Sequence, residues 1–456
     1  MKDLTQGPIG RHVVEMSIPI ASGMLLQTLY FLIDLYFVSR LGEAAIAGVS
    51  SAGTVFFIVM ALTQMLGVGT VSLMSHAVGR KDRDEANHIF NQSVVLALVC
   101  ALITLVGGYV LAGPYMEVFG PDAPTRAAGV AFLHGYIPGM GLQFALIVMG
   151  SALRGTGIVK PTMIVQMVTV LLNAALAPVL IAGWGTGIAL GPAGAGLAST
   201  LSIAVGTLIL GWYFVKLESY VEFEPAQLRP KLATWKRMLN VGLPSGGEFL
   251  MLGLYSLVIY WIIRHFGAAA QAGFGIGGRV MQAVFLPAMA IAFAVPAIAG
   301  QNYGAKMPER VRETFRRAVT ASCVIMFMLT LVVQWKGEAM VGVFTSDPVV
   351  ASFGYGFLKV ISWNFVAVGI VFTCSGMFQG LGNTWPSLIS TATRMLTFAI
   401  PGVWMSMQPG FQIVDLWHLS VATMLLQAAF SYFLLRRQLR ERLAPMTPAT
   451  APQATG

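Results

Sequence analysis

The chain has 456 residues, of which 56% are hydrophobic and 10% are charged, and its mean hydropathy is +0.74. Soluble chains are about 25% charged, so the composition excludes an ordinary soluble globule. The formal net charge of +9 does not indicate nucleic-acid binding, because the basic residues lie in loops between apolar runs and not on one face of a soluble module.

Twelve apolar segments follow one another, and a membrane-spanning helix needs roughly 20 such residues. The first six lie at 13–39, 45–74, 86–112, 127–152, 160–183 and 193–215. The second six lie at 238–264, 270–299, 311–334, 350–378, 385–407 and 413–435. We expect an all-α polytopic membrane protein with an N-lobe at 1–215, a solvated cytoplasmic linker at 216–237, a C-lobe at 238–442 and a disordered tail at 443–456.

The two halves are related by an internal repeat with an offset of 225 residues. An offset that spans six helices, an even number, predicts parallel repeats that enter the membrane in the same direction and rock against each other. The pairs are Pro19 and Pro244, Gly42 and Gly267, Gly48 and Gly273, Gly79 and Gly304, Phe90 and Phe315, Phe119 and Phe344, Asp122 and Asp347, Gly155 and Gly380, Gly157 and Gly382, and Pro161 and Pro386.

The basic residues between the expected helices are strongly biased to one side. The side opposite the N-terminus holds only Arg40, Arg126, Arg264 and Lys336. Because Lys and Arg are retained in cytoplasmic loops, both termini should be cytoplasmic, in a bacterial inner membrane.

Charged residues inside the expected spans are few, since each costs about 2.5 to 3.5 kcal/mol at a helix centre. The candidates for functional intramembrane charges are Asp34, Glu248, Arg279, Lys359 and Arg394. Asp34 shares a helix face with Gln27 and Tyr30, and the fifth expected helix carries a polar stripe of Gln166, Thr169 and Asn173.

These residues predict a cation site formed by Asp34, Asn173, Gln27, Tyr30 and Thr169. Na⁺ prefers several oxygen ligands, so Asp34 would be a metal ligand in that case, whereas a proton needs only the carboxylate. Two structural alternatives stay open. Asp34 could lie at the outer interface and snorkel or pair there, and Asn173 could form a hydrogen bond between helices.

A further set of polar residues is expected to line the cavity that takes the cargo. The set is Gln64, Tyr136, Gln143, Gln166, Glu248 and Tyr255. Glu248 could instead be a carboxylate near water at the cytoplasmic end of its helix. Pro19 and Pro244 are candidate hinges, because proline leaves a helical carbonyl unpaired and can kink the helix.

Motifs for catalysis or nucleotide binding are missing from the sequence. It contains no HExxH, no paired cysteine motif and no Walker loop, so we expect neither an enzyme nor a cofactor beyond the coupling ion. Two complete lobes would suffice for a monomer.

The sequence resembles the multidrug and toxic compound extrusion (MATE) family over nearly its whole length. The likeness lies in LIDLYFVSRLGEAAIAG, GVGTVSLMSHAVGRKDRDEA and SALRGTGIVKPT of the first half, and in VGLPSGGEF, AGQNYGAKMPERV and GMFQGLGNTWPS of the second. The resemblance implies antiport of Na⁺ or H⁺ against amphipathic, often cationic drugs. It places the coupling cation at Asp34, a bending proline at Pro19 and a functional asparagine at Asn173.

The sequence departs from this family at two positions. The branch containing DNA-damage-inducible protein F, which the chain resembles most, often has a second aspartate where this chain has Ala177. Other branches have an acidic residue where this chain has Leu252, and Glu248 could substitute for it. Two rival functions remain: a lipid or lipid-linked oligosaccharide flippase, which should have more helices or a strongly cationic cavity, and a passive channel, which should have a polar pore.

Overall fold

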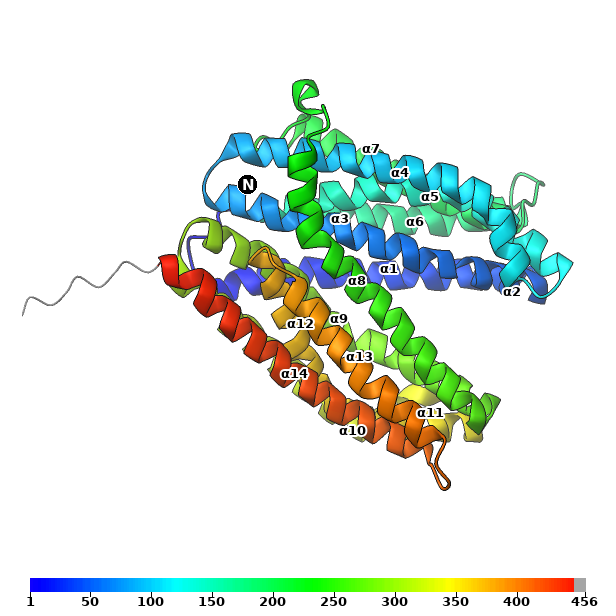
Figure 1. Cartoon of the computed structure of the whole chain (residues 1–456). Coiled ribbons are helices and arrows are strands. Elements are labelled where there is room, and N and C mark those ends of the chain that lie inside the picture. Colours follow the sequence, from blue (N-terminus) through cyan, green and yellow to red (C-terminus); the bar gives the residue numbers. More distant parts are fainter. Residues whose placement is uncertain (447–456) are drawn as a thin grey trace, which may run out of the picture. The chain divides into compact units, whose positions relative to one another are not determined.

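The computed structural model of the chain describes residues 1–446, apart from the side chains of residues 31, 35, 54 and 56. The described residues form helices and contain no strand, and eleven of their helical stretches are long and apolar enough to cross a membrane (Figure 1). A twelfth, α13 (Trp385–Ser406), has 22 residues, or about 33 Å at 1.5 Å per residue. It is less apolar because it carries Arg394 and several hydroxyl residues. The predicted all-α polytopic fold is confirmed.

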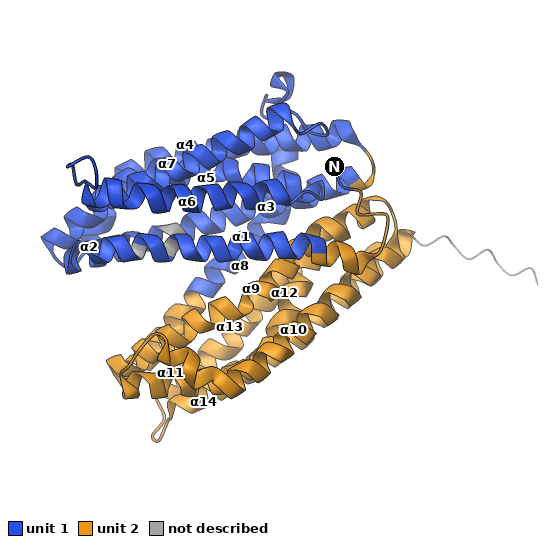
Figure 2. Cartoon of the chain, turned by 180° about the vertical axis from the view of Figure 1, so that it is seen from behind, with its two compact units in different colours: residues 1–2, 15–78, 82–253 blue, residues 3–14, 79–81, 254–456 orange. Residues whose placement is uncertain are grey.

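The chain forms two compact units, coloured separately in Figure 2. Unit 1 comprises residues 1–2, 15–78 and 82–253, and unit 2 comprises 3–14, 79–81 and 254–456. The first half contains α1 (Ile9–Ser39), α2 (Glu43–Ala52), α3 (Thr54–Gly79), α4 (Arg83–Phe119), α5 (Ala123–Gly155), α6 (Lys160–Ala182) and α7 (Pro192–Lys216). After the turn η1 (Pro225–Gln227), the second half contains α8 (Leu232–Ile263), η2 (Arg264–Phe266), α9 (Ala268–Gly304), α10 (Pro308–Gly342), α11 (Pro348–Ile361), η3 (Ser362–Asn364), α12 (Phe365–Gly380), α13, α14 (Ile413–Leu443) and η4 (Ala444–Met446).

The fourth crossing is the centre of each unit. In unit 1 it is α5, which packs against α2, α4 and α7. In unit 2 it is the α11–η3–α12 stretch, which packs against α9, α10 and α14. Both central crossings are two-thirds buried, whereas side chains on outer helices such as Leu208 and Val110 are exposed. Apolar side chains on the outside are expected of a protein whose solvent is lipid.

The repeat predicted from sequence is present in the backbone of both units. Gly42 and Gly267 precede α2 and α9 with φ of +99° and +89°, a region in which glycine has no steric penalty. Lys81 and Lys306, also 225 residues apart, have φ of +60° and +58°. Two non-glycine residues with the same uncommon conformation at one offset show that the halves share local geometry as well as composition.

Repeated glycines also mark the closest helix contacts. A Cβ atom on Gly48 would lie 2.6 Å from the Thr125 carbonyl oxygen, where α2 crosses α5. A Cβ atom on Gly273 would lie 2.8 Å from the Val350 carbonyl oxygen, where α9 crosses α11. Small residues allow such close approach of membrane helices, which explains this repeat pair physically.

The aspartate pair of the repeat caps two helices. Asp122 Oδ1 accepts a hydrogen bond of 2.8 Å from the Thr125 N–H at the start of α5. Asp347 Oδ1 accepts one of 2.8 Å from the Val349 N–H at the start of α11. Both helices therefore begin where a carboxylate satisfies an otherwise unpaired N–H group.

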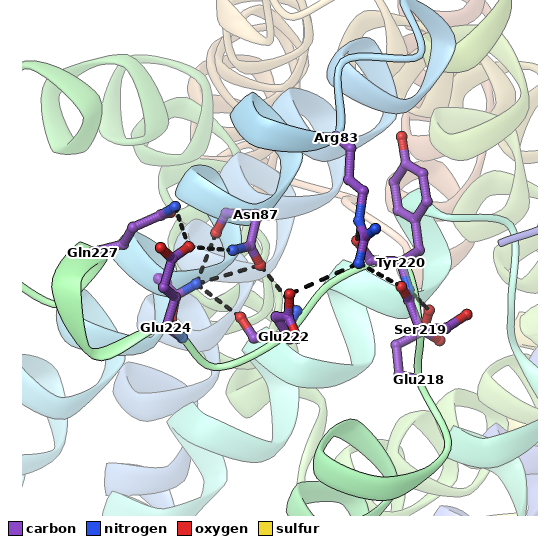
Figure 3. A network of polar contacts seen from close by, with 9 residues as sticks. Arg83, Asn87, Glu218, Ser219, Tyr220, Glu222, Glu224 and Gln227 are labelled. Atoms are coloured by element: carbon purple, nitrogen blue, oxygen red, sulfur yellow. Dashed lines mark hydrogen bonds and ion pairs between the residues drawn. The ribbon is translucent and has the colours of Figure 1, made fainter.

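The linker between the halves is docked, which corrects the expectation of a solvated tether. Asn87 in α4 accepts from the Glu222 N–H at 2.9 Å and donates to Glu224 Oε2 at 2.9 Å, while Arg83 donates to the Ser219 carbonyl at 2.7 Å (Figure 3). Val221 is fully buried. The backbone of the linker obtains its hydrogen bonds from α4, so its acidic residues do not indicate free solvation.

Two predicted boundaries need correction. The segment 232–237 of the expected linker belongs to α8, and the expected disordered tail begins with the last turn of α14, whose Leu443 is fully buried. Residues 444–446 form η4, and the other tail residues, 447–456, lie outside the described part of the chain.

Candidate functional site

The polar stripe of α1 faces the interior of unit 1. Gln27, Tyr30 and Asp34 are half-buried, while Leu25 and Leu32 on the other face are each 57% exposed. The spacing of three and four residues places the polar side chains on one side of the helix. The sequence therefore turns the Asp34 side chain away from the lipid-facing residues.

The Asp34 carboxylate is surrounded by neutral polar groups from four helices. Ser199 Oγ of α7 donates to Asp34 Oδ2 at 3.2 Å. Tyr30 of α1 and Tyr136 of α5 interact electrostatically with the carboxylate, and the Asn173 side chain of α6 interacts with it as well. Asn173 is fully buried, and Ser199 and Tyr136 are buried as well.

The site contains polar atoms that the described residues leave unsatisfied. Asp34 Oδ1 is buried without a hydrogen-bond partner, and neither amide atom of Asn173 forms a hydrogen bond of normal geometry within the described residues. Buried polar groups are nearly always paired, so each exception requires an explanation. A carboxylate with hydroxyl and amide oxygens beside it can hold a proton or a hard monovalent cation.

The other residues predicted for the cation site lie on the same helices. Gln166 of α6, which was predicted for the substrate cavity, faces α1, since a Cβ atom on Gly23 would lie 3.8 Å from its Oε1 atom. Thr169 Oγ1 donates to the Gln166 carbonyl at 2.8 Å, and its methyl group packs against Gly206 of α7. Gln27 lies two turns before Asp34 on α1. The described contacts do not bring Thr169 or Gln27 to the carboxylate, and their roles stay predictions.

The residues predicted for the substrate cavity do not form one cluster among the described contacts. Tyr136 lies beside Asp34, whereas Gln64 of α3 and Gln143 of α5 are half-buried and have no described contact with it. Gln143 Oε1 is buried without a hydrogen-bond partner in the described structure. Glu248 of α8 is half-buried and belongs to unit 1.

Tyr255 belongs to unit 2 and is held by two polar contacts. Its hydroxyl lies 3.0 Å from Ser420 Oγ of α14, and Arg394 Nη2 of α13 donates to it at 3.1 Å. The Arg394 guanidinium also stacks over the Tyr255 ring, 4.6 Å from its centroid. Within the described residues of unit 2, the partner of Arg394 is therefore Tyr255.

The two candidate hinge prolines lie inside continuous helices. Pro19 is inside α1 and Pro244 is inside α8. Each removes one helical N–H donor, but neither interrupts its helix. Their role as hinges stays a prediction.

Ser199 is the site residue that sequence reasoning missed. It lies in an apolar helix near another small hydroxyl residue, Ser202, and such hydroxyls often bond to their own helix. Only the packing of α7 beside α1 distinguishes its hydroxyl from that of Ser202, which donates to the Ala198 carbonyl at 2.8 Å.

The curated relatives of the chain are named as transport proteins. The chain is 25% identical over 387 residues to the multidrug export protein MepA of Staphylococcus aureus strain N315, with 83% of each chain covered. It is 22% identical over 404 residues to the FAD transporter of Shewanella oneidensis strain MR-1, which covers 88% of this chain and 89% of that protein.

Solved structures of MATE transporters share the fold. The structure of MATE in complex with MaL6 has a TM-score of 0.91 at 24% identity, covering 96% of this chain and 98% of that one. MATE in the bent conformation has a TM-score of 0.91 at 23% identity, covering 97% and 98%. The family profile described as MatE matches residues 19–179 and 244–405, two segments that begin at the repeated prolines. The chain therefore belongs to the MatE family, the MATE family of multidrug efflux transporters.

Proposed function

We propose that this transporter is an antiporter that exchanges H⁺ or Na⁺ at Asp34 for amphipathic drugs. The observation that supports the proposal most strongly is the half-satisfied carboxylate: Asp34 Oδ2 has one hydroxyl partner, and Oδ1 is buried without one. An unpaired carboxylate inside a membrane protein is costly. A bound cation or proton removes that cost.

Coupling requires that cation and drug favour different conformations. A ligand shifts an equilibrium only by its difference in affinity for the two states, and each ligand then opposes the other by the same factor. Cation binding at Asp34 from outside would favour the state that binds drug poorly, and the two lobes would rock between the states. Pro19 and Pro244 would absorb the bending.

The neighbours of Asp34 would stabilise both its charged form and its cation-bound form. Ser199 and Asn173 can donate to the carboxylate when it is charged and offer oxygens to a cation when one is bound. Ala177 leaves Asp34 without a second acid in α6, so one carboxylate would carry the exchange. One coupling ion, with one positive charge, would then be exchanged per transport cycle.

The membrane topology is part of the proposal. The bias of Lys and Arg places both termini in the cytoplasm of a bacterial inner membrane, with a monomer as the transporting unit and lipid around it. Export of drug would then run towards the side that holds Arg40, Arg126, Arg264 and Lys336.

Transport of a fluorescent cationic dye by the purified protein in vesicles tests the function. A Na⁺ gradient and a pH gradient are imposed separately, and the one that drives dye movement identifies the coupling ion. We expect one of the two gradients to drive accumulation. Dye movement that only follows its own gradient would indicate a passive channel, and movement of labelled phospholipid without dye transport would favour the flippase alternative.

A further inference from the structure

Unit 2 contains a small pocket of about 120 Å³ between α13 and α14. Arg394 and Thr397 line it from α13, and Thr423, Leu426, Gln427 and Phe430 line it from α14. Arg394 lies nine residues after the first residue of α13 and twelve before the last. The pocket is therefore near the middle of the membrane span, where an ionisable residue indicates a functional site.

Arg394 has few partners for a half-buried cation. Of its five N–H donors, the described structure pairs one, with Tyr255 Oη, and its Nε atom is buried without a partner. No described carboxylate of unit 2 forms an ion pair with it. Buried charges are normally paired, and the stacking on Tyr255 compensates only part of the cost.

The other walls of the pocket combine hydroxyl, amide and apolar groups. Gln427 donates to Thr391 Oγ1 at 3.3 Å, but its Oε1 atom is buried without a partner in the described residues. Leu426 is 51% exposed and Phe430 is half-buried. The pocket thus has one cation and several apolar side chains among its lining residues, a combination found in sites for amphipathic ligands.

We propose that this pocket is a subsite for the oxyanion of an amphipathic ligand, with a carboxylate or phosphate against Arg394 and an apolar body against Leu426 and Phe430. Guanidinium is suited to this role because its planar N–H groups match the two oxygens of a carboxylate or phosphate. Tyr255 is held by Ser420 on its other side, so it acts as a positioning residue that fixes the guanidinium. The inference rests on the proposed export function and adds an anionic group to its substrate class.

A matched pair of dyes tests the subsite on the purified full-length chain in detergent. Tetramethylrhodamine carries a free carboxylate, and tetramethylrhodamine methyl ester has the same body with the carboxylate masked. Binding of each is followed by fluorescence anisotropy for the wild type, Arg394→Gln, Arg394→Lys and Arg279→Gln. The last variant removes an arginine of α9 that does not line the pocket.

Arg394→Gln should weaken binding of the free acid by about tenfold or more, equivalent to ~1.4 kcal/mol, and leave binding of the ester unchanged. Arg394→Lys should retain part of the affinity, and Arg279→Gln should behave as the wild type. Short-chain phosphatidylglycerol is titrated in parallel. Arg394-dependent binding of this lipid in place of the dye would assign the oxyanion to a phospholipid.

Equal affinity of wild type and Arg394→Gln for both the acid and the lipid would overturn the subsite. An equal loss for acid and ester would also overturn it, because it would mean that Arg394 only supports the shape of the pocket. Efflux of the ester through Asp34 separates the two proposals. If Asp34-dependent efflux of the ester is intact while Arg394→Gln leaves binding of the acid unchanged, only the subsite proposal fails. If Arg394→Gln weakens binding of the acid while efflux does not depend on Asp34, only the antiport proposal fails.

Discussion

Replacing Asn91 by alanine should release the linker from α4. The Asn91 side chain is fully buried; its Nδ2 donates to the Glu222 carbonyl and its Oδ1 accepts from the Glu224 N–H, at 2.9 and 3.0 Å. The variant leaves two linker groups without partners, at about 1 to 3 kcal/mol for each buried group. A total of about 2 to 6 kcal/mol, at 1.4 kcal/mol per tenfold, raises the population of open linker on the order of 30-fold or more.

A protease that cleaves after glutamate measures this opening, since cleavage tracks the open population when closing is fast. The linker offers Glu218, Glu222 and Glu224, and cleavage there should accelerate by that factor in the Asn91→Ala variant. The repeat supplies the control: position 316, 225 residues later, is an exposed arginine, and Arg316→Ala should leave linker cleavage unchanged. An unchanged rate in Asn91→Ala would refute the docking.

Three further predictions concern local geometry. Gly48→Val should lower the melting temperature of the detergent-purified protein, because its Cβ would lie 2.6 Å from the Thr125 carbonyl oxygen. Gly107→Ala should not lower it, because nothing lies within 4 Å of a Cβ atom there. Equal melting temperatures for the two variants would contradict this packing. Lys306→Gly should raise stability by up to about 1 kcal/mol, since it relieves a positive φ, and a lower melting temperature would count against that strain. The hydrogen bond from the Thr125 N–H lowers the pKa of the Asp122 carboxylate. Asp122→Ala should therefore be less stable than the wild type above the unfolded pKa of about 3.9, and the difference in stability should shrink as the pH falls through the folded pKa. A difference that does not depend on pH would contradict the capping role.

The order of the membrane crossings could be predicted because each crossing needs a long apolar run. The ends of the helices could not be predicted from hydropathy, because the apolar run ends at the first charged residues whereas the helix continues beyond them. Segment 311–334 was expected from its apolar residues, while α10 extends from Pro308 to Gly342. The interruption between α11 and α12 was missed because it depends on contacts with α10, such as the bond from Thr330 Oγ1 to the Ser362 carbonyl at 2.9 Å.

The candidate cation site could be predicted only in part. Periodicity alone placed Tyr30 and Asp34 on one face, and the structure keeps them together. The neighbours from α5 and α7 depend on helix packing, which a single sequence does not specify. Tyr136 was therefore expected in the substrate cavity and lies beside Asp34, and Ser199 was not identified. The pocket at Arg394 was missed for the same reason, since its walls come from α13 and α14.

The most direct test of the account is gradient-driven dye transport by Asp34→Asn in reconstituted vesicles, compared with wild type and with Asp122→Asn. The asparagine keeps the shape of the side chain but removes the charge that a proton or Na⁺ would neutralise. We predict that Asp34→Asn remains folded and loses transport driven by the cation gradient, while Asp122→Asn retains it. Wild-type transport by Asp34→Asn under the same gradient would contradict the claim that this carboxylate couples the cation to the drug.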